Sequence, residues 1–376
     1  MPVLTRQRIC INALLYAASA AAAVVSFFNG TAADAAVVFA LGAGAYLLDL
    51  RLSQSQHGAP ILNFVLSFGA GFASRVAAKG ASSCIIPVGL AALLPWMPGL
   101  PLVQAFCEII QKSLVAGTTR FMHAMISAMQ MGFGFSVGVK TAALMWEGNL
   151  AAYRGAVDLS SDTCGAGGHF WRLPSQSNSP LEPPTAPATW LWMSSPLRGI
   201  ALFCTLAGYA SIIGASVRQM PLLFLAAFAA LAINFYSEPV FGPFAGAALA
   251  AACSGLVASA GQRILVCTRE RCLRSARVHA LGPALADRPD PALIFIFLAV
   301  LILVPGTIGV KGAAQMFGGV DNMSTSNYTA ASHADSTAVS AGAFTLQMLG
   351  LGLAQALGLT LAGAVCGRLC QRNVPK

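Results

Sequence analysis

Ten apolar runs, most of them close to the length that crosses a lipid bilayer, constrain the fold more than any other feature. A membrane-spanning helix needs about 20 predominantly apolar residues with few charges. Of the 376 residues, 56% are hydrophobic and 9% are charged, whereas soluble domains carry roughly a quarter charged residues. We therefore predict an all-α polytopic membrane protein with ten transmembrane helices, at residues 10–28, 35–50, 60–78, 83–103, 114–138, 199–217, 220–236, 240–260, 292–310 and 338–363.

The basic residues are distributed unequally between the two sides of the predicted membrane. With a cytosolic N-terminus, 15 of the 22 Lys and Arg residues fall on the cytosolic side and seven on the other. Since cytosolic loops are enriched in Lys and Arg, we predict a multi-pass integral membrane protein with both termini cytosolic. The net charge of +9 then reflects membrane orientation, and we expect no nucleic-acid partner. The Arg-rich loop between 260 and 292 is interpreted as a topology anchor, or as a docking site for acidic lipid head groups.

Three N-x-S/T sequons, at Asn29, Asn322 and Asn327, fall in loops predicted to face away from the cytosol. They are candidate glycosylation sites, and their positions agree with the predicted orientation. The N-terminus has an alternative interpretation as a signal peptide, because basic residues precede its apolar run. That run continues to Phe28, which is longer than a typical signal-peptide core and favours a first membrane span.

An internal repeat pairs two stretches that contain helix breakers. Residues 93–105, LLPWMPGLPLVQA, align with residues 301–313, LILVPGTIGVKGA. A second alignment matches residues 116–132 with residues 341–357. Together the alignments pair Pro98-Gly99 with Pro305-Gly306, Gln104 with Lys311, and Gln130 with Gln355.

The alignments divide the predicted spans into two repeats of five. Because each repeat crosses the membrane an odd number of times, the second enters in the opposite orientation, an arrangement that is common in secondary transporters. The predicted organisation is a short cytosolic N-terminus (1–9), a first repeat (10–146), a polar Pro- and Ser-rich linker (147–196), a second repeat (197–370) and a cytosolic tail (371–376).

Three segments resemble the two signature regions of the threonine/serine exporter (ThrE) family. They are PGLPLVQAFCEIIQKSLVAGTTRFMHAMISAMQMGFGFSVG (98–138), LILVPGTIGVKG and AFTLQMLGLGLAQALGL. The first is most similar to the eukaryotic branch, the pheromone-regulated membrane proteins of fungi and their protist relatives. The resemblance implies a fused ten-span exporter of threonine and serine, while two-subunit relatives imply dicarboxylates such as succinate. Members usually carry a long hydrophilic region before the first span, whereas nine residues precede Cys10 here.

The paired breaks are the first candidates for a substrate site. Proline inside a span breaks or kinks the helix, and broken backbone in a membrane is tolerated where it is buried in protein or lines a wet cavity. One interpretation is that Pro98-Gly99 and Pro305-Gly306 present half-helix ends to a small polar substrate. The other is that each Pro-Gly pair ends a span near the membrane interface.

Polar side chains near the breaks are further candidates. Glu108 is interpreted as a proton-coupling acid, or as half of an ion pair with Lys112 four residues on. Arg120 is suited to grip a substrate carboxylate, or else it extends to the cytosolic surface. His123 is interpreted as a proton relay or as a hydrogen-bonded packing residue. The repeat-paired amides Gln130 and Gln355 join helices or bind substrate, and the motifs Gly134-x-x-x-Gly138 and Ala354-x-x-x-Gly358 predict close helix packing.

The best-supported hypothesis is a secondary transporter that exports small polar metabolites such as threonine or serine, by alternating access with proton coupling. Its expected partners are an amino acid or dicarboxylate substrate, the lipid bilayer and a second copy of the chain. The alternatives are a non-transporting scaffold or signalling protein, and a channel. The sequence has no Walker loop, dinucleotide fingerprint or metal-ligand cluster, so we expect neither an enzyme nor a cofactor or metal. The ten cysteines lie mostly in or beside spans, so no disulfide framework is expected.

Overall fold

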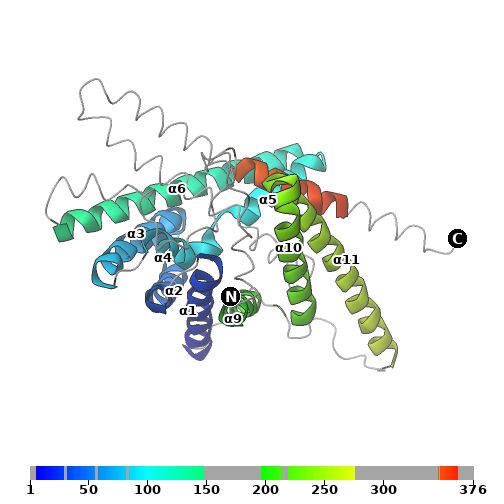
Figure 1. The fold of residues 1–376 in the computed structure, drawn as a ribbon, viewed down its shortest axis with the longest axis horizontal. Coiled ribbons are helices and arrows are strands. Elements are labelled where there is room, and N and C mark those ends of the chain that lie inside the picture. Colours follow the sequence, from blue (N-terminus) through cyan, green and yellow to red (C-terminus); the bar gives the residue numbers. More distant parts are fainter. Residues whose placement is uncertain are drawn as a thin grey trace, which may run out of the picture. The chain divides into compact units, whose positions relative to one another are not determined.

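The structure, a computed structural model, describes residues 6–28, 32–55, 58–81, 84–147, 196–212, 215, 219–275, 346 and 348–362. These residues form helices joined by turns (Figure 1). They divide into two compact units. Unit 1 holds the described residues up to Met97 and from Ser127 to Tyr209. Unit 2 holds Pro98 to Ile126, the described residues from Ala210 to Ser275, and the C-terminal helix.

The helices of each unit follow from the apolar runs. Unit 1 contains α1 (Arg6–Phe28), α2 (Ala32–Leu52), η1 (Ala59–Ile61), α3 (Leu62–Ala81), α4 (Ile85–Leu93), η2 (Leu94–Trp96) and most of α9 (Pro196–Ile212). Unit 2 contains α5 (Gly99–Ile110), α10 (Met220–Phe241), α11 (Pro243–Ser275) and the C-terminal helix, Met348–Ala362. The long helix α6 (Leu114–Glu147) begins in unit 2 and enters unit 1 at Ser127.

The described helices coincide with nine of the ten predicted runs, and the run at 292–310 lies outside the described residues. Among the described residues, three stretches are long and apolar enough to cross a membrane on their own: Ile9–Phe28, Ala32–Leu52 and Phe244–Gly261. The number rises to four if the pair Ile85–Trp96 and Gly99–Ile110 is one span. The all-helical described residues and these spans support an integral membrane protein. The ten-helix inverted repeat and its domain boundaries stay predictions.

Glycines let α3 and α6 pack with their backbones in contact within unit 1. A Cβ on Gly134 would meet the Phe64 carbonyl, and a Cβ on Gly138 would meet the Phe68 carbonyl. Gly71 of α3 makes the reciprocal approach to the α6 backbone. The predicted packing role of Gly134-x-x-x-Gly138 is therefore confirmed, because a side chain at either glycine would push the two helices apart.

Two carboxylates on α2 hold both ends of the half-span formed by α4 and η2. Asp34 is fully buried, and its Oδ1 accepts a hydrogen bond of 3.0 Å from the backbone N–H of Cys84, the residue before α4. A carboxylate at this place also interacts favourably with the helix dipole. At the other end, the Asp49 side chain accepts a hydrogen bond from Trp96, the last residue of η2. The half-span is thereby fixed against α2 at its start and at its end.

An aromatic cluster joins α1, α2, η2 and α9. Tyr16 lies at its centre, with ring centroids 5.9 Å from Tyr46, 4.9 Å from Trp96 and 6.2 Å from Tyr209. Such ring pairs contribute about 0.5–1.5 kcal/mol each beyond the apolar area that they bury. The cluster therefore adds a second attachment for Trp96, next to its hydrogen bond with α2.

The expectation about cysteines is wrong at Cys84, which is disulfide-bonded. The other cysteines whose side chains the structure describes, Cys10, Cys107, Cys204 and Cys253, are free thiols. Cysteine positions along the sequence do not reveal which thiols the fold brings within bonding distance, because a disulfide requires Cα atoms less than about 7 Å apart.

The buried contact of Asp34 gives a test of unit 1. Asp34→Ala leaves the Cys84 N–H without its acceptor, so we expect a loss of stability on the order of 1–3 kcal/mol. Thermal unfolding of the detergent-purified protein, followed by fluorescence-detected size exclusion, measures this loss. Asp34→Asn keeps an oxygen acceptor and should lose less. Equal losses in the two variants would show that the hydrogen bond does not carry the effect.

Candidate functional site

The helix of the fourth predicted run breaks at Met97 and Pro98. Met97 is extended, with φ −62° and ψ 135°, as expected for a residue that precedes a proline. The helix restarts as α5 at Gly99, and the Pro98 carbonyl accepts a hydrogen bond of 3.2 Å from the Leu102 N–H. The predicted break at Pro98-Gly99 is confirmed, and both residues are buried.

α5 ends in a Schellman turn that reverses the chain. The Lys112 N–H donates to the Ile109 carbonyl at 3.0 Å, and the Ser113 N–H donates to the Glu108 carbonyl at 2.9 Å. This pattern needs a left-handed residue just past the helix, usually glycine. Here that residue is Lys112, with φ 67°. Because α6 starts directly afterwards, α5 and the first part of α6 form a helical hairpin, residues 98–126, which we call the α5–α6 hairpin.

Gly117 lets the two arms of the α5–α6 hairpin come close together. A Cβ at this position would lie 2.6 Å from Ile109 Cγ1, 2.9 Å from the Ala105 carbonyl oxygen and 3.0 Å from the Ile109 nitrogen. Two of these three atoms belong to the backbone of α5, which cannot move aside as the end of a side chain does. The position therefore requires glycine.

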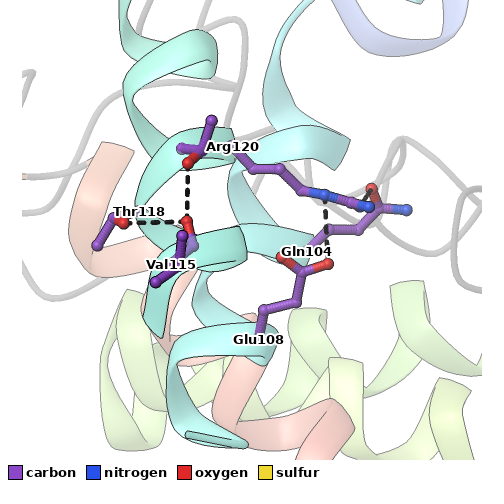
Figure 2. Close-up of polar contacts among 6 residues, drawn as sticks. Gln104, Glu108, Val115, Thr118 and Arg120 are labelled. Atoms are coloured by element: carbon purple, nitrogen blue, oxygen red, sulfur yellow. Dashed lines mark hydrogen bonds and ion pairs between the residues drawn. The ribbon is translucent and has the colours of Figure 1, made fainter. Parts of the chain in front are cut away.

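Three polar side chains meet between the arms of the hairpin (Figure 2). Arg120 Nε lies 3.2 Å from Glu108 Oε1, and Arg120 Nη1 donates to Gln104 Oε1 at 3.2 Å. Gln104 and Glu108 are four residues apart and share one side of α5. We call these three residues the polar cluster. Its side chains remain accessible, since Arg120 is 52% exposed and Glu108 is 25% exposed.

The polar cluster has unused hydrogen-bonding capacity. Glu108 Oε2 is buried and has no hydrogen-bond partner, so the carboxylate uses one of its two oxygens. The neighbouring hydroxyls do not compete for it. The Thr118 hydroxyl lies within hydrogen-bonding distance of the Leu114 carbonyl, at 2.8 Å, and of the Val115 carbonyl, at 3.2 Å (Figure 2), and the Thr119 hydroxyl donates to the Val115 carbonyl at 2.7 Å. The cluster can therefore accept another polar group without first losing every bond that it makes.

The predicted ion pair between Glu108 and Lys112 is wrong, because Glu108 forms its ion pair with Arg120. The i,i+4 rule applies along a continuous helix, and Lys112 lies in the left-handed turn that ends α5. The turn sends the chain back as α6, which returns Arg120 to the level of Glu108. Arg120 is therefore engaged with two side chains of α5, rather than extended alone to a membrane surface.

The C-terminal helix packs against α5 within unit 2. Leu102 of α5 and Met348 are buried in one apolar cluster, and Val103 and Ala356 are buried in another. The Cys107 thiol lies 3.9 Å from the Ala356 carbonyl, at the range of a weak S–H hydrogen bond. Unit 2 therefore joins α5 to a helix from the second half of the sequence. Both contain segments that resemble the family's signature regions.

The remaining candidates fall elsewhere. His123 is exposed and Gln130 is half-buried on α6, and neither takes part in the bonds of the polar cluster. Gln355 is fully buried in the C-terminal helix. Within the described ranges no group of three or more His, Cys, Asp or Glu residues could hold a metal ion. Outside the described residues lie Pro305, Gly306 and Lys311, and the sequon residues Asn29, Asn322 and Asn327.

Sequence reasoning missed Asp34 and Asp49, the two acids that hold the half-span. The signal was available, because ionisable residues inside a predicted span are rare and usually have a partner. Asp34 lies just before the predicted run at 35–50 and Asp49 lies just inside its end, positions where charged residues commonly flank a span.

A protein-family model described as "Putative threonine/serine exporter" matches residues 9–142. Residues 9–142, about a third of the chain, are therefore similar to the ThrE family. The match runs from α1 into α6 and includes the broken span and the whole α5–α6 hairpin. No curated protein and no solved structure matches the chain. ThrE is a transporter family, which agrees with the membrane-spanning helices, while the place of this chain in the eukaryotic branch stays a prediction.

Gly117 gives a test of the hairpin geometry. Gly117→Val places a side chain against the α5 backbone, so we expect a loss of stability of about 1–3 kcal/mol and loss of the Arg120–Glu108 contact. Thermal unfolding in detergent measures the first effect. The control is Gly44→Val on α2, where a Cβ would meet nothing within 4 Å. If the two variants are equally stable, the close approach at Gly117 is not a constraint.

Proposed function

We propose that this protein is a secondary transporter that exports small zwitterionic amino acids, with threonine and serine as substrates. The observation that carries the proposal is the polar cluster. Its Arg120–Glu108 ion pair and Gln104 lie in the hairpin directly after a broken span, inside the region that matches the family. A charge pair in such a place is costly to retain in a membrane protein and usually marks a pathway.

The charges of the polar cluster complement those of an amino acid. A free amino acid at neutral pH carries a carboxylate and an ammonium group. The Arg120 guanidinium is suited to bind the carboxylate with two parallel hydrogen bonds, and the Glu108 carboxylate to bind the ammonium group. Without substrate the two side chains neutralise each other at 3.2 Å. Substrate binding therefore exchanges one ion pair for two, and neither charge is left unpaired.

The same arrangement couples transport to protons. When Glu108 is protonated it no longer attracts an ammonium group, so a proton and an amino acid exclude each other at this residue. Mutually exclusive binding is the requirement for antiport, in which protons moving inward drive the amino acid outward. Alternating access would then be driven by an ion gradient, in agreement with the absence of an ATP-binding motif from the sequence.

Dicarboxylates are a poorer match to the cluster. Succinate offers no ammonium group, and its second carboxylate would bring a like charge towards Glu108. Like charges at short range are destabilising, and more so where water is partly excluded. The ion pair therefore favours the amino acid over the dicarboxylate as the substrate class.

The break before α5 supports a transporter over a static scaffold. The extended Met97 and the following Pro98 separate two helical segments within one run, and broken helices at substrate sites are a recurrent feature of secondary transporters. The polar cluster begins at Gln104, less than two turns beyond the break. A hinge close to the cluster would allow access to it from one side of the membrane at a time.

Counterflow of radiolabelled serine, threonine and succinate in proteoliposomes tests the proposal. We expect saturable exchange of serine and threonine above that of succinate, and acidification of the side opposite the substrate should accelerate net movement. Glu108→Gln and Arg120→Gln should each lower exchange at least about tenfold, since a hydrogen bond to a charged group contributes about 1.5–3 kcal/mol. Glu108→Gln should also remove the response to the pH gradient.

The matched control is Lys112→Asn. It removes a basic side chain that lies four residues from Glu108 and takes no part in the polar cluster. Asparagine tolerates the left-handed conformation of this position, so the turn should be kept. It should exchange amino acids within about twofold of the wild type, because it removes no interaction of the polar cluster. The proposal fails if serine and threonine exchange no faster than in protein-free liposomes. Flux that never saturates would indicate a channel, and preference for succinate would overturn the role of Glu108.

A further inference from the structure

A second polar feature of unit 2 is the side chain of Gln355 in the C-terminal helix. It is 0% exposed, and neither its Oε1 nor its Nε2 has a hydrogen-bond partner. A carboxamide can make up to four hydrogen bonds, two as donor and two as acceptor. Burying such a group unpaired is strongly unfavourable, particularly where lipid replaces water. An amide in this state has hydrogen-bonding capacity for a further polar group.

The packing around Gln355 places it between two helix contacts. Three residues before it, Gly352 approaches the Leu102 and Phe106 side chains of α5. Three residues after it, Gly358 approaches the backbone of Ala248 on α11, which confirms the packing predicted for Ala354-x-x-x-Gly358. Residues three apart lie on the same side of a helix. Gln355 therefore lies at the seam where the C-terminal helix meets both α5 and α11.

The lack of partners favours one of the two interpretations of this amide. If Gln355 joined helices, one of its amide atoms would bond a neighbouring helix, and in the structure neither atom does. The amide is also not satisfied by its own helix, in contrast to Thr360, whose hydroxyl donates to the Leu357 carbonyl at 3.0 Å. Its capacity remains available to an incoming group.

One contact between α5 and the C-terminal helix is made by the residues next to Glu108 and Gln355. The Cys107 thiol lies 3.9 Å from the Ala356 carbonyl, and these two residues directly adjoin Glu108 and Gln355. Glu108 Oε2 is the other unpaired polar atom on this part of α5. Each of these two packed helices therefore carries an unpaired polar group one residue away from this contact. Together they offer one donor group, Gln355 Nε2, and two acceptors.

We propose that Gln355 binds the side-chain hydroxyl of the transported amino acid and is the residue that selects hydroxyl-bearing substrates. This inference rests on the proposed function, because it assumes that the substrate carboxylate and ammonium group are held at Arg120 and Glu108. A hydroxyl both donates and accepts, as a carboxamide does, so it can donate to Gln355 Oε1 or accept from Nε2. A methyl group at the same place would leave the buried amide unpaired.

Selectivity follows from that difference. A site built to hydrogen-bond a hydroxyl discriminates strongly against the analogue that lacks it, because the polar group of the protein is then left without a partner. The matched substrate pairs are serine with alanine, and threonine with 2-aminobutyrate, which differ only in the hydroxyl. We expect the wild-type protein to exchange the hydroxyl member of each pair at least about tenfold more efficiently.

The test compares Gln355→Leu with the wild type in proteoliposome exchange of these four amino acids. Leucine is similar in size and makes no hydrogen bond. We expect the preference for the hydroxyl member to fall to within about twofold, while exchange of alanine and 2-aminobutyrate persists. The control Thr360→Val, on the same helix, removes a hydroxyl that is already satisfied and should leave the preference unchanged.

A second measurement, thermal unfolding without substrate, separates recognition from a structural role. Replacing an unpaired buried amide with an apolar side chain of similar shape should leave the melting temperature unchanged or raise it. A clearly lower melting temperature in Gln355→Leu would show that the amide has a structural partner, such as a bound water, and would overturn the inference. Unchanged selectivity in Gln355→Leu would also overturn it.

These outcomes are distinct from failure of the proposed function. If the wild-type protein exchanges none of the four amino acids, both the transport proposal and the role of Gln355 are wrong. If it exchanges serine and threonine and Gln355→Leu keeps the same preference, the transport proposal stands and only the role of Gln355 is wrong.

Discussion

The Schellman turn between α5 and α6 determines where the polar groups of unit 2 lie. It reverses the chain within three residues, so the early residues of α6 return along α5, and Gly117 allows that return at backbone contact. Arg120 reaches Glu108 and Gln104 only because of this geometry. A lysine in the left-handed position is less favourable than glycine there, so the turn retains a basic residue at some cost in stability.

Much of the helical architecture could be predicted from the sequence. Apolar runs separated by polar segments locate helices, because a backbone segment in lipid must satisfy its hydrogen bonds internally. The described helices coincide with those runs. The break at Pro98-Gly99 was predictable for a similar reason, since proline removes a backbone donor and restricts the residue before it. Span assignment was harder. The helix α3 is 20 residues long, but it carries Arg75 and Lys79 and is not among the stretches that are apolar enough to span a membrane on their own.

The contacts of the site were less predictable, because they depend on which segments meet in space. Spacing along one helix favoured Lys112 as the partner of Glu108, whereas the partner comes from the next helix. The burial of Gln355 depends on helices from distant parts of the sequence, and no periodic pattern reveals that both of its amide atoms lack partners. Composition and motif reasoning identified candidate residues, whereas the contacts between them depend on tertiary packing.

The clamping of the half-span Ile85–Trp96 has a mechanical consequence. Asp34 bonds the beginning of this segment, and Asp49 and the Tyr16 ring contact its end, so the segment is held rigidly against α2. When a helical segment is held rigidly, a conformational change next to it is confined to the residues that follow the segment. A rearrangement between the segment Ile85–Trp96 and α5 would therefore change the backbone torsions of Met97 and Pro98. Because the proline ring fixes φ, the change at Pro98 would be in ψ.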